Sequence, residues 1–238
     1  MTAFAFDALN GALEGAAPEV ILDAALQRHP TGLAFACSLG LEDMALLHLI
    51  RSRDLPIRAF VLDTGRLHPE TLTLLARAQR DFGPVEVYVP DRTALEAYVN
   101  GHGLDAFYES LELRRACCAI RKVEPLQRAL EGATGWITGQ RRAQSTTRTA
   151  LQPFEQDWAH GGLTKVNPLA FWSLEDAEGY VDRHAVPVNP LHARGFPSIG
   201  CAPCTRAIQP GEDPRAGRWW WEHPEHKECG LHPAKAPR

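Results

Sequence analysis

The feature that most constrains the fold is an alternation of short apolar runs with segments of helical periodicity, from residue 18 to residue 184. Runs of four to six residues that are rich in apolar side chains are typical of buried strands. The pattern predicts strands at 33–36, 58–63, 85–89, 136–139 and 163–166, and helices at 18–28, 42–51, 69–80, 93–100, 123–130 and 173–184. Strands that alternate with helices indicate βαβ units. The sequence therefore predicts an α/β fold with a doubly wound, mostly parallel sheet.

The pattern ends near residue 186, and the remaining chain is rich in Pro, Gly, His and Trp. Such a segment has too few periodic apolar residues to form a core of its own. A chain of 238 residues is long enough for one large domain or two small ones. We therefore predict an α/β domain over 1–186 and an irregular C-terminal segment over 187–238.

Polar and small residues follow two of the predicted strands. Ser38 and Gly40 lie in the turn after the first strand, and Asp63 ends the second. In a parallel sheet ligands bind at the carboxyl ends of the strands, and the backbone N–H groups of a strand-to-helix turn suit a phosphate. The turn lacks the Gly-Lys-Ser/Thr of a Walker loop and the Gly-x-Gly-x-x-Gly of a dinucleotide site. Taken alone, this segment favours an ordinary strand-to-helix turn over a phosphate site.

An arginine-rich segment follows the fourth strand. Arg141, Arg142 and Arg148 alternate there with hydroxyl and amide residues. Guanidinium groups match the oxygens of phosphate and sulfate in a bidentate way. The position favours an anion clamp over a solvated polar loop.

The cysteines provide the strongest chemical signal. Cys117 and Cys118 are adjacent, and Cys201 and Cys204 form a Cys-x-x-Cys pair. Four soft thiolates predict an iron–sulfur cluster or zinc. Adjacent cysteines fit a zinc knuckle poorly, which places the cluster modestly ahead. Cys229 lies beside Gly230 in the C-terminal tail; its position alone favours a spare surface thiol over a nucleophile.

Charge and hydropathy limit the partners. The formal net charge of −4 disfavours a general nucleic-acid or anionic-membrane binder. We find neither a signal-peptide pattern nor an apolar run long enough to cross a bilayer. The expectation is a cytoplasmic protein with no nucleic-acid or membrane partner.

Five motifs together resemble the iron–sulfur type of assimilatory adenylyl-sulfate (APS) reductases, within the phosphoadenylyl-sulfate reductase family. They are Cys-Cys-x-x-Arg-Lys at 117–122, Gly-Gln-Arg-Arg at 139–142, Cys-x-x-Cys at 201–204, Arg-x-Gly-Arg-Trp-Trp-Trp-Glu at 215–222 and Glu-Cys-Gly-Leu-His at 228–232. Their order along the chain is also similar, and the resemblance extends from about residue 30 to residue 233.

The resemblance implies a PP-loop-type, adenine-nucleotide α-hydrolase-like fold, with nucleotide binding in 1–186. It implies a [4Fe–4S] cluster on the four paired cysteines and a catalytic Cys229 in a mobile tail. The implied reaction is thioredoxin-dependent reduction of APS to sulfite and AMP through an S-sulfo (thiosulfonate) form of Cys229, in sulfate assimilation toward cysteine. The implied reductant is thioredoxin or a glutaredoxin-like protein, and the implied assembly is a homotetramer or dimer. The implied substrate contacts are Ser38, Gly40, Asp63, Lys122, Arg141, Arg142, Arg148, Arg215 and Arg218.

Two residues depart from the family pattern. Cys37 stands where the phosphate-binding turn often begins with serine, and Arg114 stands where some members carry histidine. The alternatives are a phosphoadenylyl-sulfate (PAPS) or dual APS/PAPS reductase, a tRNA-thiolating ATP-pyrophosphatase of the same fold, and a zinc-stabilised binding module. The paired cysteines favour APS over PAPS. The turn also lacks the paired glycines of the ATP-pyrophosphatases.

Overall fold

The computed structural model describes residues 6–144, 149–223 and 231. The chain divides into two compact units. The first contains residues 1–61, 73–86 and 130–189, and the second contains residues 62–72, 87–129 and 190–238. Each unit draws on segments that are distant in sequence. The division at residue 186 stays a prediction.

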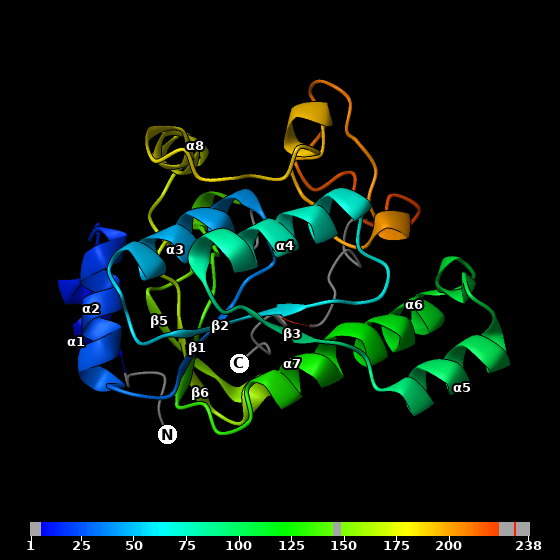
Figure 1. The fold of residues 1–238 in the computed structure, drawn as a ribbon, viewed down its shortest axis with the longest axis horizontal. Helices are drawn as coiled ribbons and strands as arrows, with labels where there is room; N and C mark the ends of the chain where they lie inside the picture. The colour runs from blue at the N-terminus through cyan, green and yellow to red at the C-terminus, as the bar shows by residue number, and fades with distance from the viewer. Residues whose placement is uncertain (1–5, 145–148, 224–230, 232–238) are drawn as a thin grey trace. The chain divides into compact units, whose positions relative to one another are not determined.

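The sheet has six strands in the order β3-β2-β1-β4-β6-β5 (Figure 1). The strands are β1 (Leu33–Ala36), β2 (Arg58–Leu62), β3 (Glu86–Tyr88), β4 (Gly135–Ile137), β5 (Phe154–Asp157) and β6 (Leu163–Val166). β1 pairs in parallel with β2 and β4, and β4 pairs in parallel with β6, whereas β5 is antiparallel to β6. From β1 the chain adds β2 and β3 on one side and then β4, β6 and β5 on the other, so the direction of strand addition reverses at β1. In α/β sheets ligands bind at such a reversal.

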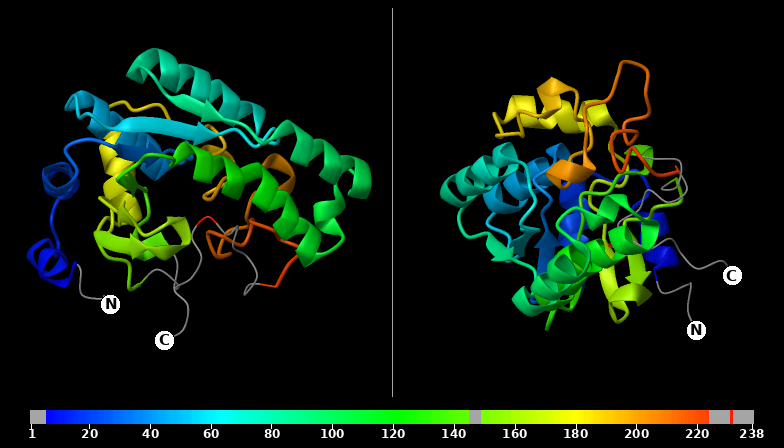
Figure 2. Two further views of the ribbon diagram at one scale, coloured as in Figure 1. Left: turned by 90° about the horizontal axis from the view of Figure 1, so that it is seen from below. Right: turned by 90° about the vertical axis from the view of Figure 1, so that its right-hand side faces the viewer.

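The helices fall between the strands. The longer ones are α1 (Asp7–Ala12), α2 (Pro18–Arg28), α3 (Leu41–Ser52), α4 (Pro69–Phe82), α5 (Arg92–His102), α6 (Leu111–Cys118), α7 (Glu124–Ala129) and α8 (Leu174–Arg183). In Figure 1, α3 and α4 cover one face of the strands β1 and β2. A π-helical turn, Ala119–Val123, joins α6 to α7 without a break. Figure 2 shows this continuous stretch from two other sides.

The core of the first unit lies between the sheet and its helices. Ile21 and Leu22 of α2, Phe35 of β1, and Leu46 and Ile50 of α3 are all fully buried there. Alternate sides of β1 are both buried, as expected for a parallel strand with helices on both faces. A second apolar cluster, in the second unit, is formed by Phe107, Trp219 and three of the paired cysteines.

The predicted fold class is confirmed, and most predicted elements lie within two residues of the observed ones. Ser173 caps α8 and forms a capping box with Asp176. The sequence reading missed α1, α6 and the edge strand β5. α6 carries two cysteines and three charged residues in eight positions, so few large apolar residues mark it as a helix. β5 reads Phe-Glu-Gln-Asp, which has the polarity of a loop.

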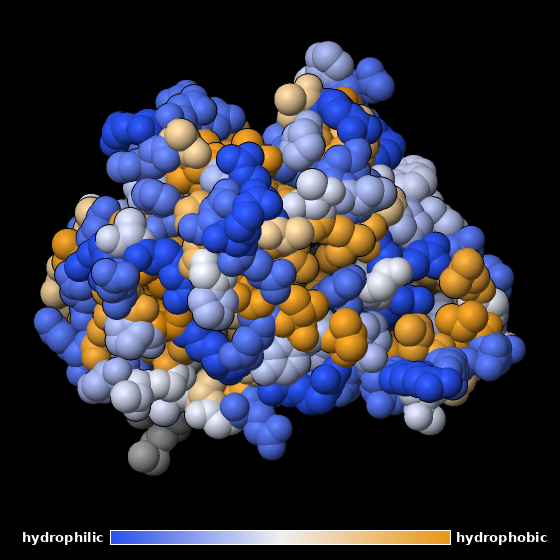
Figure 3. Space-filling view, in the orientation of Figure 1, coloured by the Kyte–Doolittle hydropathy of each residue, from blue (hydrophilic) through white to orange (hydrophobic). Residues whose placement is uncertain are grey.

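The face drawn in Figure 3 is mainly hydrophilic, with apolar side chains scattered among charged ones. Among the described residues, no helix combines the length and the apolar character needed to cross a membrane.

Candidate active site

The turn after β1 is held by its own carboxylate. The backbone N–H of Ser38 donates to Asp43 Oδ2 at 2.7 Å, and the Ser38 hydroxyl donates to the same oxygen. Leu39, between Ser38 and Gly40, is buried and has a positive φ of 62°. Non-glycine residues in this region are uncommon and gather at functional sites. Asp43 therefore fixes a tight and strained turn at the carboxyl end of β1.

Asp43 also touches the chain segment that follows β4. A Cβ atom on Gly139 would stand 2.0 Å from Asp43 Oδ1, so only glycine leaves room for the carboxylate. Burial raises the pKa of Asp43 to about 6, against the opposing effect of the two hydrogen bonds from Ser38. The carboxylate thus connects the turn at 37–43 with the start of the loop at 139–144.

Arg141 is enclosed by acceptors of the protein. Its Nε and Nη2 atoms donate to Glu42 Oε1 at 2.9 and 2.7 Å, and its Nη1 atom donates to the carbonyl of Trp172 at 3.4 Å. Gln144 adds a third hydrogen bond to Glu42 Oε1, at 2.9 Å. Burial acts to raise the pKa of Glu42, but the hydrogen bond from Gln144 and the charge and hydrogen bonds of Arg141 hold it below its ordinary value.

Arg142 points to a different part of the same unit. It pairs with Glu14 at 2.8 Å, donates to the carbonyl of Leu151 at 2.7 Å and lies over the ring of Phe171. Arg148, the third arginine of the predicted clamp, lies outside the described residues. Ser38, Gly40, Arg141 and Arg142 are therefore all in the first unit, and both described arginines are already paired with glutamates.

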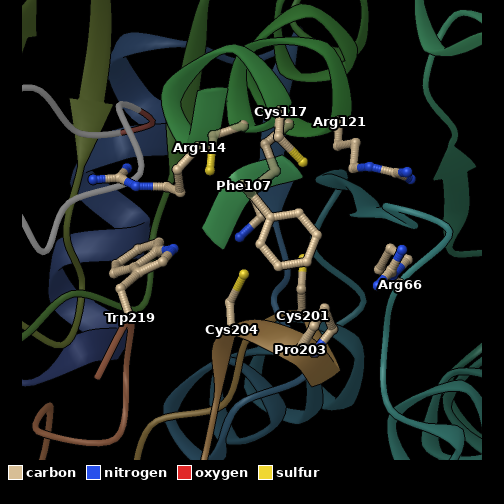
Figure 4. A pocket seen from close by; sticks show the side chains of 11 residues that line it. Arg66, Phe107, Arg114, Cys117, Arg121, Cys201, Pro203, Cys204 and Trp219 are labelled. Carbon is tan, nitrogen blue, oxygen red and sulfur yellow. The ribbon is translucent and has the colours of Figure 1, made fainter. Parts of the chain in front are cut away.

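The four paired cysteines line one pocket in the second unit (Figure 4). Its other walls are Arg66, Phe107, Arg114, Arg121, Lys122, Pro203 and Trp219. The sulfurs of Cys117 and Cys204 face the pocket from opposite sides, from α6 and from the loop around 201–204 respectively. All four thiols are free of disulfide bonds. The structure therefore brings together pairs of cysteines that are far apart in sequence, as the motifs predict.

Local structure fixes each pair. Ser110 caps α6 by accepting from the Leu113 N–H at 3.1 Å, and the helix ends at Cys118. The Cys-x-x-Cys pair begins with Cys201, whose Sγ lies 3.3 Å from the Thr64 hydroxyl. The next residue, Ala202, donates its N–H to the carbonyl of Arg66 at 2.7 Å. Segment 64–66 therefore holds one pair of thiols in place, and α6 presents the other.

Cations surround these sulfurs. Burial alone would raise the pKa of Cys201, but Lys122, the Thr64 hydroxyl, Arg218 and Arg121 together bring it below its ordinary value. The pKa of Cys204 is raised to about 12, first by burial and then by the neighbouring Cys201. Lys122 and Arg121 belong to the π-helical turn directly after the adjacent cysteines. The pocket thus favours a thiolate state at some positions more than at others.

The remaining predicted residues of the second unit have separate surroundings. Asp63 accepts from the N–H of Gly65, and Arg215 donates its backbone N–H to Asp213. Arg218 is buried, donates to Ser198 and Ile199, and lies with its Cζ 4.7 Å from the ring of Trp219. Cys229, the predicted nucleophile, lies outside the described residues.

Comparison with known proteins decides the family. The family model of the phosphoadenosine phosphosulfate reductase domain matches residues 32–207, which include the turn, the arginine loop and all four paired cysteines. The chain belongs to this family. It is therefore an oxidoreductase of the sulfonucleotide-reducing type, as the resemblance of the motifs implied.

Several relatives of this family are closely similar. The adenosine 5'-phosphosulfate reductase of Burkholderia cepacia is 57% identical over 207 residues, which cover 87% of this chain and 82% of the relative. The enzyme of the same name from Allochromatium vinosum is 55% identical over 213 residues, covering 89% of this chain and 83% of the relative.

Solved structures agree with the fold. The phosphoadenylyl-sulfate reductase of Candida auris, in its phosphate complex, has a TM-score of 0.74 and 28% identity, covering 87% of this chain and 98% of that one. The FMN adenylyltransferase of Candida glabrata, with FAD and pyrophosphate, has a TM-score of 0.58 and 14% identity, covering 98% of this chain and 81% of that one. The second likeness concerns the fold alone, and it extends the PP-loop-type architecture beyond this family.

The donor set of the pocket fits the cluster that the family resemblance implies. Four thiols face it, without a carboxylate or imidazole among the lining residues, and sulfur is the ligand that iron–sulfur clusters use. Adjacent residues on a helix point about 100° apart, so Cys117 and Cys118 reach a core of several atoms more readily than one ion. In the part of the chain that the structure describes, no three His, Cys, Asp or Glu side chains gather around a single-ion position.

Three features of this family member were missed from the sequence. One is the buried ion pair of Arg114 with Glu222, at 2.8 Å, over the ring of Trp219. The second is the π-helical turn at Ala119–Val123. The third is Arg121, whose Nη1 donates to the carbonyl of Thr64 at 2.6 Å. An arginine and a glutamate more than one hundred residues apart give no local signal, whereas Arg121 stood inside a motif already recognised.

Proposed function

We propose that this protein reduces APS to sulfite and AMP with electrons from thioredoxin or a glutaredoxin-like protein, in sulfate assimilation toward cysteine. The main support is the pocket of four free thiols with Lys122, Arg121 and Arg218 around it, in a chain 57% identical to an enzyme named adenosine 5'-phosphosulfate reductase. The proposed nucleophile is Cys229. The proposed substrate contacts are Ser38, Gly40, Asp63, Lys122, Arg142, Arg148, Arg215 and Arg218, and Arg141 belongs to the same loop as Arg142.

In the first proposed step the Cys229 thiolate attacks the sulfur of the sulfate group. A bond forms between the two sulfurs, the S–O bond to the phosphate breaks, and AMP leaves as the phosphate anion. The enzyme then holds Cys229 as an S-sulfonate. Two like charges at about 4 Å repel by roughly 4 kcal/mol at an effective dielectric constant near 20. Lysine and arginine side chains at the site offset this repulsion and stabilise the charge that develops on the leaving group.

In the second proposed step a thiolate of thioredoxin attacks the Cys229 sulfur. Sulfite leaves with the electron pair of the S–S bond, and a mixed disulfide joins the two proteins. The second thiol of thioredoxin attacks this disulfide, which frees Cys229 and leaves thioredoxin oxidised. The two thiols of the partner supply both electrons, so the reaction balances without a further reductant.

Cys117, Cys118, Cys201 and Cys204 are the proposed ligands of a [4Fe–4S] cluster. When bound, the cluster supplies cross-links between two segments of the second unit and a local electrostatic field. Arg121 and Lys122 follow Cys118 by three and four residues, in the π-helical turn, and both line the pocket of the four thiols. Their proposed role is to hold the anionic substrate near the nucleophile.

PAPS, or both nucleotides, is the alternative substrate. The solved relative from Candida auris is named for PAPS, but its identity of 28% is half that of the relatives named for APS. The closer relatives therefore favour APS. We further propose a cytoplasmic homotetramer or dimer.

The test is release of sulfite by anaerobically purified protein with thioredoxin and either APS or PAPS. We expect brown protein with about four irons per chain, turnover with APS, and a strong preference for APS over PAPS. Cys229→Ser should retain the iron and lose turnover. Glu86→Gln, which removes only an exposed ion pair with Arg58, is the control and should retain both. Colourless, zinc-containing protein would contradict the cluster, and turnover by Cys229→Ser would contradict the nucleophile.

A further inference from the structure

Two consecutive acidic residues at the start of α3 connect the turn after β1 to the loop after β4. Glu42 accepts from Arg141 and Gln144 of the loop, and Asp43 accepts from Ser38 in its own turn while it packs against Gly139. All of these residues lie in the first unit. The turn and the loop are therefore joined by two adjacent carboxylates rather than standing apart.

The guanidinium group of Arg141 is already hydrogen-bonded within the protein, so it is poorly placed to bind a ligand directly. All three guanidinium nitrogens have acceptors within the protein, and two of them share Glu42 Oε1. The Arg141 side chain is 5% exposed and that of Glu42 is 17% exposed. In contrast, the neighbouring pair of Arg142 with Glu14 is exposed at 26% and 59%. Moving a buried, paired arginine away from its glutamate carries a large free-energy cost, because the glutamate would remain buried without a counter-charge.

We propose that Arg141 is a positioning residue that acts through Glu42, and that it does not itself touch the anionic part of the nucleotide. The Arg141–Glu42 pair sets the spacing between the turn at Ser38–Gly40 and the loop at 139–144. The close packing of Asp43 on Gly139 constrains the same spacing. This inference deepens the proposed function, and it changes the role expected of Arg141 from a direct contact to an indirect one.

The two roles predict opposite effects for the removal of charge. If Arg141 bound phosphate directly, Glu42→Gln would remove a competing anion, so AMP would bind more tightly. If the pair positions the loop, the same change weakens the binding of AMP. It also weakens the binding of adenosine, which carries no phosphate. The sign of the effect and its dependence on the phosphate therefore separate the roles.

The experiment measures equilibrium binding of AMP and adenosine by calorimetry at two salt concentrations. We expect Glu42→Gln and Arg141→Met each to weaken both ligands about fivefold or more, by similar factors. The double variant should lose little more than either single one, because both changes break one interaction. The salt dependence of AMP binding should stay that of the unchanged protein in Arg141→Met. Glu86→Gln is the control, since Glu86 forms an exposed pair with Arg58 at 2.7 Å; we expect less than a twofold change.

Tighter AMP binding by Glu42→Gln would overturn the inference. So would a loss in Arg141→Met that is confined to AMP and accompanied by a weaker salt dependence. If Glu42→Gln does not fold, Gln144→Met removes one hydrogen bond to Glu42 without leaving an unpaired charge, and it should weaken both ligands in the same proportion. Normal AMP binding without sulfite release in the unchanged protein would contradict the proposed function alone. Failure to bind either ligand would contradict both.

Discussion

At the scale of single residues, the first unit is most sensitive at Gly139. The Asp43 carboxylate occupies the space where any other residue would place its Cβ atom. The same carboxylate holds the N–H and hydroxyl of Ser38. One missing side chain therefore allows a buried acid to connect two loops.

Gly139→Ala should lower the free energy of unfolding by about 2 kcal/mol or more, because a methyl group has to displace a buried carboxylate. AMP binding should weaken in parallel. Urea unfolding followed by circular dichroism measures the first effect and calorimetry the second. Gly101→Ala is the matched control: Gly101 lies inside α5 with open space around its Cα, so alanine should stabilise the protein by up to about 1 kcal/mol. Equal stability of Gly139→Ala and the unchanged protein would contradict the close contact.

Asp43 should also give the protein a characteristic pH dependence. Its pKa is raised from 3.8 to about 6 in the folded protein. Below pH 4 the group is protonated in both states, whereas between pH 4 and 6 only the folded state keeps the proton. The stabilising contribution of that proton is therefore lost as the pH rises, by about 3 kcal/mol in total for a shift of roughly two units. Urea unfolding from pH 4 to 7 should show this loss in the unchanged protein and not in Asp43→Asn. Parallel curves for the two proteins would argue against a raised pKa.

At the scale of elements, α6 carries two of the four paired cysteines, and a buried ion pair joins it to the segment 215–222. Arg114 and Glu222 are joined by two hydrogen bonds of 2.8 Å, and their side chains are 1% and 8% exposed. The Arg114 guanidinium also lies 4.9 Å from the ring centre of Trp219. Since buried charges are tolerated only when paired, the pair specifies how this segment packs on α6.

Arg114→Met should therefore destabilise the second unit by about 3–5 kcal/mol, because it leaves the Glu222 carboxylate buried and unpaired. Adding Glu222→Gln to it should recover most of this loss. Arg92→Met removes an exposed pair with Glu96 on α5, and it should cost less than about 1 kcal/mol. Thermal unfolding of the four proteins at matched iron content tests the comparison. A double variant no more stable than Arg114→Met would contradict the explanation.

What could be predicted from the sequence depended on how local the signal was. The parallel strands were recoverable because β1 and β2 are apolar on both faces and end in small or polar residues. β5 was missed because an edge strand with one solvated face can be polar. At the site, the thiols were found by their chemistry. The role of Glu42 was not found, because its partner Arg141 lies ninety-nine residues away and no local sequence pattern indicates such a pair.

At the scale of the whole molecule, the two compact units differ in chemistry. All four paired cysteines belong to the second unit, and Cys37 of the first unit is buried in its hydrophobic core. A group bound by the four thiols should therefore stabilise one unit more than the other, because binding energy adds to folding energy where the ligands are.

Anaerobic removal of the proposed iron–sulfur cluster with a chelator should raise amide hydrogen exchange in α6 and in residues 201–221. Exchange in β1 and β4 should change much less. Exchange read by mass spectrometry, with and without the metal, measures both regions in one experiment. A uniform increase across the chain would show that the two units unfold as one.

The π-helical turn between α6 and α7 has a consequence for protein engineering. It places one extra residue in a helical turn, and this sets the rotation of Arg121 and Lys122 relative to Cys117 and Cys118. Transplanting the six residues of the motif onto a regular designed helix would swing the basic groups away from the sulfurs. A single-residue insertion or deletion inside the stretch would do the same. A designed scaffold that carries this motif must therefore reproduce the π-helical turn as well as the amino-acid sequence.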